Sequence, residues 1–311
     1  MAAPPTRAVV LPDEPALPAR IAVRKTYKIY IGGQFPRSES GRSYVVARPD
    51  ATPLANAVRG SRKDVRDAVK AARGAFAGWS DRTAMNRGQV LYRAAEVLEG
   101  RRDQFQQEVA EAEGLAPAQA REQVDRSIDR WVWYAGWADK ITQILGTVNP
   151  VAASYFDFTV PEPTGVVGVV APESSSLLGL VSRLAPVVVS GNTAVVLSSE
   201  SRPLPAVTLT EVLATSDVPG GVINLITGYK KELVPWLASH MDVNALDVWG
   251  VPAEMRAAVE EAAVENVKRL SRPRRDADPE RFDWLDDKRA QRPEWIAAFL
   301  EMKTVWHPIG A

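Results

Sequence analysis

The 311-residue sequence contains no cysteine and only two histidines, His240 and His307. Without cysteine, the chain can form neither disulfides nor thiolate metal sites, and it has no thiol nucleophile. Two histidines are too few for a histidine-rich metal centre, so we expect no bound metal. The absence of cysteine is also compatible with a reducing, cytoplasmic environment.

The sequence likewise lacks an excess of charge, because 38 Lys and Arg residues balance 38 Asp and Glu residues. No field of one sign favours nucleic acid or an anionic membrane, and we expect neither as a partner. The most apolar stretch, residues 165–189, is interrupted by Pro172, Arg183 and Pro186, which does not match a membrane-spanning helix. Because the N-terminus shows no apolar signal segment either, we expect a cytoplasmic protein.

From residue 165 onward, strand and helix patterns alternate. Apolar runs rich in β-branched residues, at 165–171, 194–197 and 222–228, are typical of strands buried on both faces. Helical spacing separates these runs, at 177–190, 204–215 and 231–240. Strands that alternate with helices predict an α/β fold with a parallel sheet.

The preceding part of the chain reads differently. Residues 25–35 alternate like a strand that ends at Gly32-Gly33, and residues 37–49 continue as its hairpin partner. Helical spacing follows over 62–79, 83–113 and 118–145. The last of these contains an aromatic cluster that we interpret as helix packing, with a cofactor cage as the alternative: Trp131, Trp133, Tyr134 and Trp137.

These patterns divide the chain into six segments. They are a Pro-rich flexible arm (1–24), a hairpin with a helical layer (25–145), a second hairpin (146–162), a βαβ core (163–271), a charged linker (272–292) and a terminal helix with a strand (293–311). We interpret the linker as a solvated connection pinned by Phe282, Trp284 and Leu285; the alternative is a charged docking segment.

Several segments, in order, resemble the aldehyde dehydrogenase superfamily. The similar stretches are IGGQFPRSESG (31–41), residues 57–105, YAGWADKI (134–141), VPEPTGVVGVVAP (160–172), LAPVVVSGNTAVVLSSE (184–200), VPGGVINLITG (218–228) and FLEMKTVW (299–306). The resemblance implies a Rossmann-like parallel sheet, an oligomerisation hairpin at 146–162, a C-terminal oligomerisation strand and an NAD(P) cofactor. The closest variant is the non-catalytic half of family-16 aldehyde dehydrogenases.

The family's catalytic segment has no counterpart in this sequence. SRPRRD (271–276) stands where the family has Glu-Leu-Gly-Gly, and the catalytic cysteine beyond it is missing. We therefore expect the catalytic domain to be largely absent and assign no catalytic residue.

Five positions match the family's cofactor-binding motifs and are interpreted as vestigial: Pro172, Ser174, Glu200, Gly228 and Gly250. Their neighbours depart from the family. Glu173 and Ser174 replace the Trp-Asn pair whose amide holds an oxyanion, and a carboxylate there would repel one. Leu197 replaces a ribose-binding Lys, and Lys230 replaces a glycine that lets the backbone approach the cofactor. We therefore expect NAD(P) binding to be weak or lost.

The resemblance also implies assembly through the hairpin and the terminal strand. Candidate interface residues alternate along both segments: Tyr155, Phe156, Phe158, Lys303, Val305, Trp306 and His307. In the family, such a strand extends the hairpin sheet of a neighbouring subunit, and exposed edge strands are normally covered. We expect a hetero-oligomer with a full-length aldehyde dehydrogenase, or a homo-oligomer.

The leading hypothesis is an aldehyde-dehydrogenase-like pseudoenzyme that acts as a structural or regulatory subunit. One alternative is a residual NAD(P) sensor that uses Glu200, Gly228 and Gly250. The other is an enzyme after all, either an oxidoreductase or a hydrolase with Ser174 as nucleophile and His240 as base. The position of His240 at a helix end favours an ordinary turn histidine.

Overall fold

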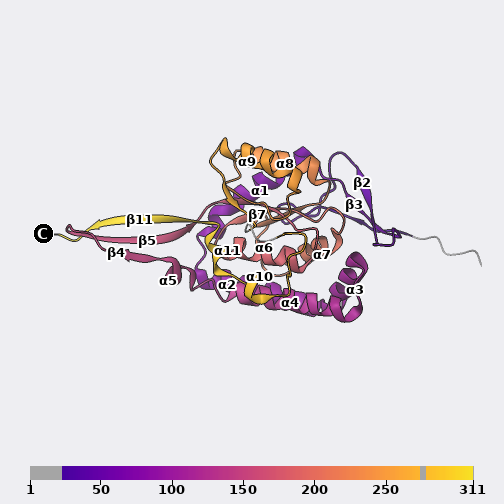
Figure 1. Cartoon of the computed structure of the whole chain (residues 1–311), viewed down its shortest axis with the longest axis horizontal. Helices are drawn as coiled ribbons and strands as arrows, with labels where there is room; N and C mark the ends of the chain where they lie inside the picture. Colours follow the sequence, from indigo (N-terminus) through magenta and orange to yellow (C-terminus); the bar gives the residue numbers. More distant parts are fainter. Residues whose placement is uncertain (1–22, 274–277, 311) are drawn as a thin grey trace, which may run out of the picture.

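The computed structural model describes residues 23–273 and 278–310 and has a five-stranded parallel sheet at its centre (Figure 1). The strand order is β10-β9-β6-β7-β8. The strands are β6 (Val166–Val170), β7 (Thr193–Leu197), β8 (Ile223–Ile226), β9 (Ala245–Asp247) and β10 (Arg269–Ser271). The predicted α/β fold with a parallel sheet is confirmed. The predicted N-terminal arm, residues 1–24, lies almost entirely outside the described residues.

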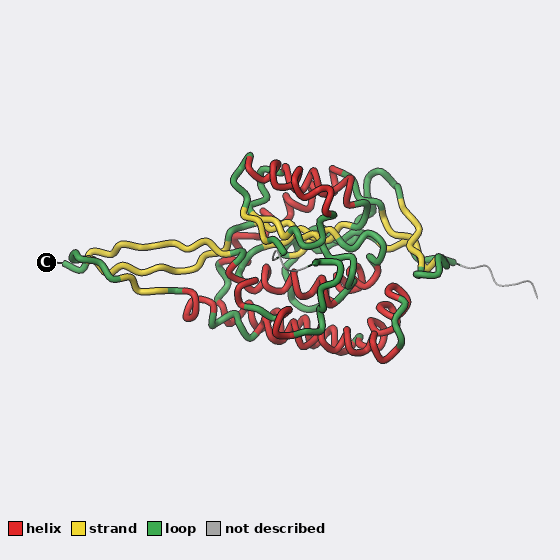
Figure 2. The backbone as a smooth tube through the Cα atoms, viewed as in Figure 1, coloured by secondary structure: helices red, strands yellow, loops and turns green. Residues whose placement is uncertain are grey.

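Helices cover both faces of this sheet (Figures 1 and 2). One face carries α1 (Arg62–Ser80), α8 (Lys230–Ser239), the short 3-10 turn Ala253–Met255 and α9 (Arg256–Val264). The other face carries α6 (Leu178–Val189) and α7 (Leu204–Ala214), with α2 (Ala84–Gly100), α3 (Arg102–Glu113) and α4 (Pro117–Ala135) as a further layer.

The strand residues alternate between two apolar cores. Val167 and Val169 join the core under α4 and α6, whereas Val166 and Val170 join the core under α1 and α8. Because both faces of the sheet are covered, both sets of side chains are apolar, and the strands read as continuous apolar runs.

The helical layer mostly follows the sequence pattern. Residues 83–113 form the pair α2 and α3, and Trp131 and Tyr134 are fully buried, which confirms helix packing for the aromatic cluster. The stretch 118–145 is not one helix, because α4 ends before Gly136 and α5 (Ile141–Leu145) follows after a turn. Glycine is a weak helix former, which favours the break at this position.

The predicted turn at Gly32-Gly33 is present, since Ile31 and Gln34 exchange backbone hydrogen bonds across it, both at 3.0 Å. The predicted pairing of residues 25–35 with residues 37–49 is wrong. The N-terminal sheet has the order β1-β3-β2, where β1 is Thr26–Tyr27, β2 is Ser43–Ala47 and β3 is Pro53–Val58. The segment after β1 instead exchanges backbone hydrogen bonds between Tyr30 and Leu225 at the edge of β8, at 2.9 and 2.7 Å. Gly32 and Gly33, with φ of 61° and 83°, turn the chain there. The alternating segment therefore pairs with β3 and with the edge of β8, and not with the strand that follows it in the sequence.

A second, three-stranded sheet projects from the body (Figures 1 and 2). Its order is β11-β5-β4, with β4 (Thr147–Asn149), β5 (Tyr155–Pro163) and β11 (Leu300–Pro308). β11 runs antiparallel to β5 from Leu300 opposite Pro163 to Pro308 opposite Tyr155. We call this sheet the three-stranded arm. The strand that the family resemblance places against a neighbour's hairpin pairs here with the chain's own hairpin.

The described part of the charged linker packs against the body. Phe282 and Trp284 are 9% and 5% exposed, so the predicted pinning by aromatic residues is confirmed. α10 (Asp287–Ala290) is also anchored by charge, because the Asp287 carboxylate accepts hydrogen bonds from Arg126 and Arg130 of α4 at 2.7 and 2.8 Å. A final short helix, α11 (Pro293–Ala297), leads into β11. Over residues 23–273 and 278–310, no helix is both long and apolar enough to cross a membrane.

Candidate functional site

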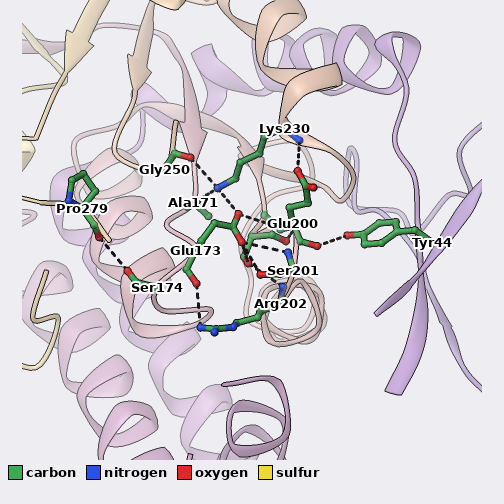
Figure 3. Close-up of polar contacts among 12 residues, drawn as sticks. Tyr44, Ala171, Glu173, Ser174, Glu200, Ser201, Arg202, Lys230, Gly250 and Pro279 are labelled. Atoms are coloured by element: carbon green, nitrogen blue, oxygen red, sulfur yellow. Dashed lines mark hydrogen bonds and ion pairs between the residues drawn. The ribbon is translucent and has the colours of Figure 1, made fainter. Parts of the chain in front are cut away.

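The candidate site lies at the carboxyl ends of the parallel strands, where β6 has β7 on one side and β9 on the other (Figure 3). After β7 and β8 the chain returns to add β9 beside β6, which makes this the switch point of the strand order. Ligands of open α/β sheets bind in the crevice outside this point. The family-derived cofactor positions fall on the loops that follow β6, β7, β8 and β9.

Lys230, the first residue of α8, points into this crevice (Figure 3). Its ammonium donates hydrogen bonds to the carbonyls of Ala171 and Gly250, at 2.7 and 2.9 Å. It also forms an ion pair with the Glu173 carboxylate, at 2.5 Å. The lysine is only 3% exposed, and all three of its partners belong to the chain. A glycine at this position would leave the same volume empty.

The Glu173 carboxylate is surrounded by donors from the loop after β7. It accepts hydrogen bonds from Ser199 Oγ at 2.6 Å, from the Glu200 amide at 2.8 Å and from Ser201 Oγ at 2.9 Å. Burial acts to raise the pKa of Glu173, but Lys230, Ser199 and the Glu200 amide outweigh it and lower the pKa below its ordinary value. Glu173 is therefore an ionised, fully partnered carboxylate.

Glu200 is held beside this pair. Its carboxylate accepts a hydrogen bond from the Lys230 amide at 2.8 Å, which places a negative charge at the N-terminus of α8. Its carbonyl accepts a hydrogen bond from the Tyr44 hydroxyl at 3.2 Å. The sequence-derived cofactor residue therefore stabilises the start of a helix.

The two retained glycines pack against the chain's own backbone. A Cβ on Gly250 would lie 2.0 Å from the Ala171 carbonyl oxygen, so no other residue fits without movement of the backbone. Gly228 has φ +143°, and a Cβ there would lie 3.1 Å from the Gly60 amide nitrogen. Both glycines are explained by close approach within the fold.

Ser174 and Pro172 also face protein atoms. Ser174 Oγ donates to the Pro279 carbonyl and accepts from Trp284 Nε1, both at 3.2 Å, while Pro172 is buried. His240 ends α8, where its Nδ1 accepts from the Asp242 amide at 3.2 Å and burial lowers its pKa. Neither hydrogen-bond set joins Ser174 to His240, so the structure does not assemble the serine–histidine pair that a hydrolase requires.

The amides that precede α6 have an anionic partner from the chain itself. The amide and the hydroxyl of Ser176 both donate to Glu113 Oε1, at 2.7 and 2.6 Å. Ser175 Oγ donates to Gln123 Oε1 at 3.1 Å. The carboxylate at the end of α3 therefore occupies the position before α6 at which an external anion could bind.

A buried ion pair beside the crevice was not predicted. Arg183 and Asp247 are both fully buried and lie 2.6 Å apart. The Arg183 guanidinium lies 4.8 Å from the Trp249 ring and 4.2 Å from the Trp295 ring. The sequence signal was available, since Arg183 is the one charged residue in the apolar helix 178–189.

Aromatic residues close the crevice on the side of β9. Trp249 follows β9, and its ring lies 5.0 Å from Phe282 and 5.5 Å from Trp284, both from the linker. Trp295 of α11 lies 5.6 Å from Trp249. We call Trp249, Phe282, Trp284 and Trp295 the aromatic plug. These ring contacts hold the linker and α11 against the segment that follows β9.

The candidate interface residues divide between the two faces of the three-stranded arm. Directly paired residues of antiparallel strands share a face. His307 opposes Phe156, Val305 opposes Phe158 and Lys303 opposes Val160. Five of the seven candidates therefore share one largely apolar face: Phe156, Phe158, Lys303, Val305 and His307. Trp306 opposes Asp157, and the Trp306 and Tyr155 rings, 5.8 Å apart, lie on the other face.

No group of three or more potential metal-ligating side chains is present among residues 23–273 and 278–310.

Comparison with known proteins shows what this architecture is related to. Residues 35–272 match the profile of the aldehyde dehydrogenase family. The chain belongs to the aldehyde dehydrogenase family. Among curated relatives, it is 31% identical over 268 residues to cytosolic aldehyde dehydrogenase 1 of Elephantulus edwardii, covering 84% of this chain and 52% of that protein. It is 33% identical over 269 residues to aldehyde dehydrogenase 1A1 of Rattus norvegicus, covering 84% and 53%.

Solved structures agree. The HpcC structure from Thermus thermophilus superposes with a TM-score of 0.75 and 31% identity, covering 79% of this chain and 48% of that one. An aldehyde dehydrogenase from Bacillus cereus in complex with NAD+ gives a TM-score of 0.74 and 25% identity, covering 79% and 50%. The chain thus spans about half the length of the relatives that it matches.

Proposed function

We propose that this aldehyde dehydrogenase family chain is a pseudoenzyme that serves as a structural or regulatory subunit of a catalytically complete aldehyde dehydrogenase. The observation that carries the proposal is the Lys230–Glu173 ion pair in the crevice where a dinucleotide would lie. The absence of cysteine supports it, because the chain then has no thiol to add to an aldehyde carbonyl.

The residues present do not fit an NAD(P) cofactor. A dinucleotide at the switch point needs room for its backbone contacts at the ends of β6 and β8. Here the Lys230 side chain bridges Ala171 and Gly250 across that space, and the Glu173 carboxylate would repel the pyrophosphate. The aromatic plug closes the neighbouring side. We therefore derive no hydride-transfer step for this chain.

The three-stranded arm supports a role in assembly. On its apolar face Phe156 is 45% exposed, and on the other face Trp306 is 58% exposed. The arm projects from the body, so both faces and the outer edges of β4 and β11 are accessible to a second chain (Figure 1). Apolar faces and open strand edges of this kind are normally covered by a partner.

The proposal is tested by isolating the protein from its own cells through an N-terminal tag and measuring the mass and composition of the native assembly. We expect a stoichiometric full-length aldehyde dehydrogenase. The matched control is the same chain with Phe158→Asp on the apolar face of the arm, which should lose the partner and remain folded. A monomer, or partner recovery that is equal for both chains, contradicts the proposal.

Calorimetry distinguishes the second candidate function, a nucleotide sensor, from the pseudoenzyme subunit. We expect no heat of binding for NAD+ or NADP+ at millimolar concentrations with the wild-type chain. Binding in the micromolar range would overturn the loss of the cofactor and favour the sensor, whose motivating residue is Glu200. Because Glu200 already bonds the Lys230 amide, that outcome would require the start of α8 to rearrange.

A further inference from the structure

A small cavity on the α1 and α8 side of the molecule is lined mainly by cations. It has a volume of about 180 Å³ and lies between the loop at residues 40–42, the junction of β3 with α1 at residues 59–62, and the first two turns of α8. Its charged lining residues are Arg42, Arg59, Arg62 and Glu232. None of the crevice residues Glu173, Glu200 and Lys230 contributes to it.

The positive charges in this cavity outnumber the negative charges. Glu232 is the one carboxylate in the lining, and it is engaged by Arg59 through Nε at 3.0 Å and through a second guanidinium nitrogen. Over residues 23–273 and 278–310, neither Arg42 nor Arg62 forms an ion pair with a carboxylate. Two guanidinium groups therefore line the cavity without a contact ion pair, although Arg59 and, after it, Arg42 help to lower the pKa of Glu232.

Aromatic rings orient the cations without using their N–H groups. The Arg62 guanidinium lies 4.0 Å from the Trp236 ring centroid, and Trp236 also lines the cavity. Arg59 lies 4.9 Å from the Tyr229 ring. Stacking on a ring face fixes the plane of a guanidinium and leaves its edge donors available for a ligand.

A capping box engages part of the start of α1. The Ser61 amide donates to the Asp64 carboxylate at 2.7 Å, and the Asp64 amide donates to the Ser61 hydroxyl at 3.4 Å, so the capping box already uses these two amides. The remaining donors toward the cavity are the guanidinium groups of Arg42 and Arg62 and the hydroxyls of Ser40 and Ser61. Forked guanidinium donors with hydroxyl neighbours match the oxygens of a phosphate group.

We propose that this cavity binds a small phosphate monoester, with the phosphate held by Arg42 and Arg62 and the substituent beside Trp236. The cavity is smaller than the roughly 300–1,000 Å³ typical of pockets for drug-sized ligands, so a dinucleotide is excluded. The ligand site is separate from the crevice at the strand ends and does not depend on the proposed pseudoenzyme role.

The test titrates inorganic phosphate and phenyl phosphate into the full chain by calorimetry at constant ionic strength. We expect dissociation constants below about 1 mM for the wild-type chain, with phenyl phosphate the tighter ligand because its ring contacts Trp236. The double variant Arg42→Ala/Arg62→Ala should bind at least tenfold more weakly. Glu232→Gln, which frees Arg59, should bind several-fold more tightly.

The matched control is Arg66→Ala/Arg93→Ala, which removes the same charge from exposed positions outside the cavity. It should retain wild-type affinity. Both double variants should keep the wild-type unfolding midpoint, because the four arginines are exposed. Equal loss in both double variants, or wild-type dissociation constants of tens of millimolar, overturns the proposal in favour of non-specific anion attraction.

Discussion

The crevice and the three-stranded arm differ in how far their side chains are buried and partnered within the chain. The crevice lies at the carboxyl ends of the parallel strands, and the arm projects from the body. In the crevice, Lys230 and Glu173 are partnered within the chain, and three of the four rings of the aromatic plug are buried, with Trp295 partly buried. In the arm, Phe156 and Trp306 remain about half exposed, and the edges of β4 and β11 are open. The polar groups of one region are partnered by the chain itself, and the other region presents surface that a second chain can cover.

This difference shows that residues which match a family motif can be explained by the fold alone. Gly250 and Glu200 match family cofactor motifs, yet each has a sufficient structural role, in backbone packing and at the start of a helix. A motif residue therefore does not by itself indicate a cofactor. The contacts around it decide between the two interpretations, and substitutions in the two regions test them.

The largest effect is expected for Arg183→Met, which leaves the Asp247 carboxylate buried without its cation. Removal of one partner of a buried pair should lower the free energy of unfolding by about 3–5 kcal/mol. Arg93→Met, in an exposed pair with Glu96, is the control and should change it by less than about 1 kcal/mol. Urea denaturation measures both. Similar small losses in the two variants would show that the crevice is not held by its buried charges.

The next largest effect is expected for Lys230→Met, which preserves the shape of the side chain but removes its charge. At pH 7 the variant should lose about 2–3 kcal/mol, because the partly buried Glu173 carboxylate loses its ammonium partner. Lys231→Met, at the exposed neighbouring position, is the control and should be neutral. Equilibrium unfolding of both variants gives the difference.

The pH dependence of that loss follows from the pKa of Glu173. In the wild-type chain the folded pKa is lowered from its ordinary value of 4.5, so the ion pair stabilises the fold above that pH and less below it. In Lys230→Met the Glu173 carboxylate keeps its hydrogen bonds from Ser199 and the Glu200 amide but loses the ammonium, so its pKa should be higher than in the wild-type chain. The stability difference between the two chains should therefore shrink as the pH falls below about 4.5. A difference that is constant between pH 7 and pH 4 contradicts the ion pair.

Gly250→Ala distinguishes packing from cofactor binding. The added Cβ would lie 2.0 Å from the Ala171 carbonyl oxygen, and overpacking should cost about 1–3 kcal/mol without any nucleotide present. Gly74→Ala in α1, where a Cβ meets no atom within 4 Å, should instead stabilise by about 0.5–1 kcal/mol. Thermal unfolding of both chains is the measurement. A neutral Gly250→Ala would return this glycine to a role in ligand approach.

The sequence predicted the sheet because its strands are apolar on both faces. Residues 165–171 and 194–197 form β6 and β7, and the helical spacing located α1, α2 and α8. The N-terminal strand was misplaced because alternation at residues 25–35 does not specify a partner. Tyr30 pairs with Leu225, about two hundred residues away, and only the folded sheet provides that edge.

The site was predicted only as a list of substitutions. The sequence identified Glu173 and Lys230 as departures from the family but could not show that they bind each other, because they are 57 residues apart and meet only when β6 and α8 pack. Arg183 and Asp247 carried one usable signal, a charge within an apolar run. No sequence signal indicated the position of the aromatic plug over the crevice, because that position depends on the path of the linker.

Phe156→Asp in the arm should have the smallest effect on the free energy of unfolding. It should have the largest effect on assembly. Phe156 is 45% exposed and contacts Phe158 at 5.4 Å between ring centroids, so the lone chain should lose only about 1 kcal/mol. Association measured by sedimentation of the native assembly should fall at least tenfold, because the substitution places a charge on the apolar face. Val45→Asp on β2, also 56% exposed, is the control and should leave association unchanged. If both variants weaken assembly equally, general surface apolarity rather than the arm drives association.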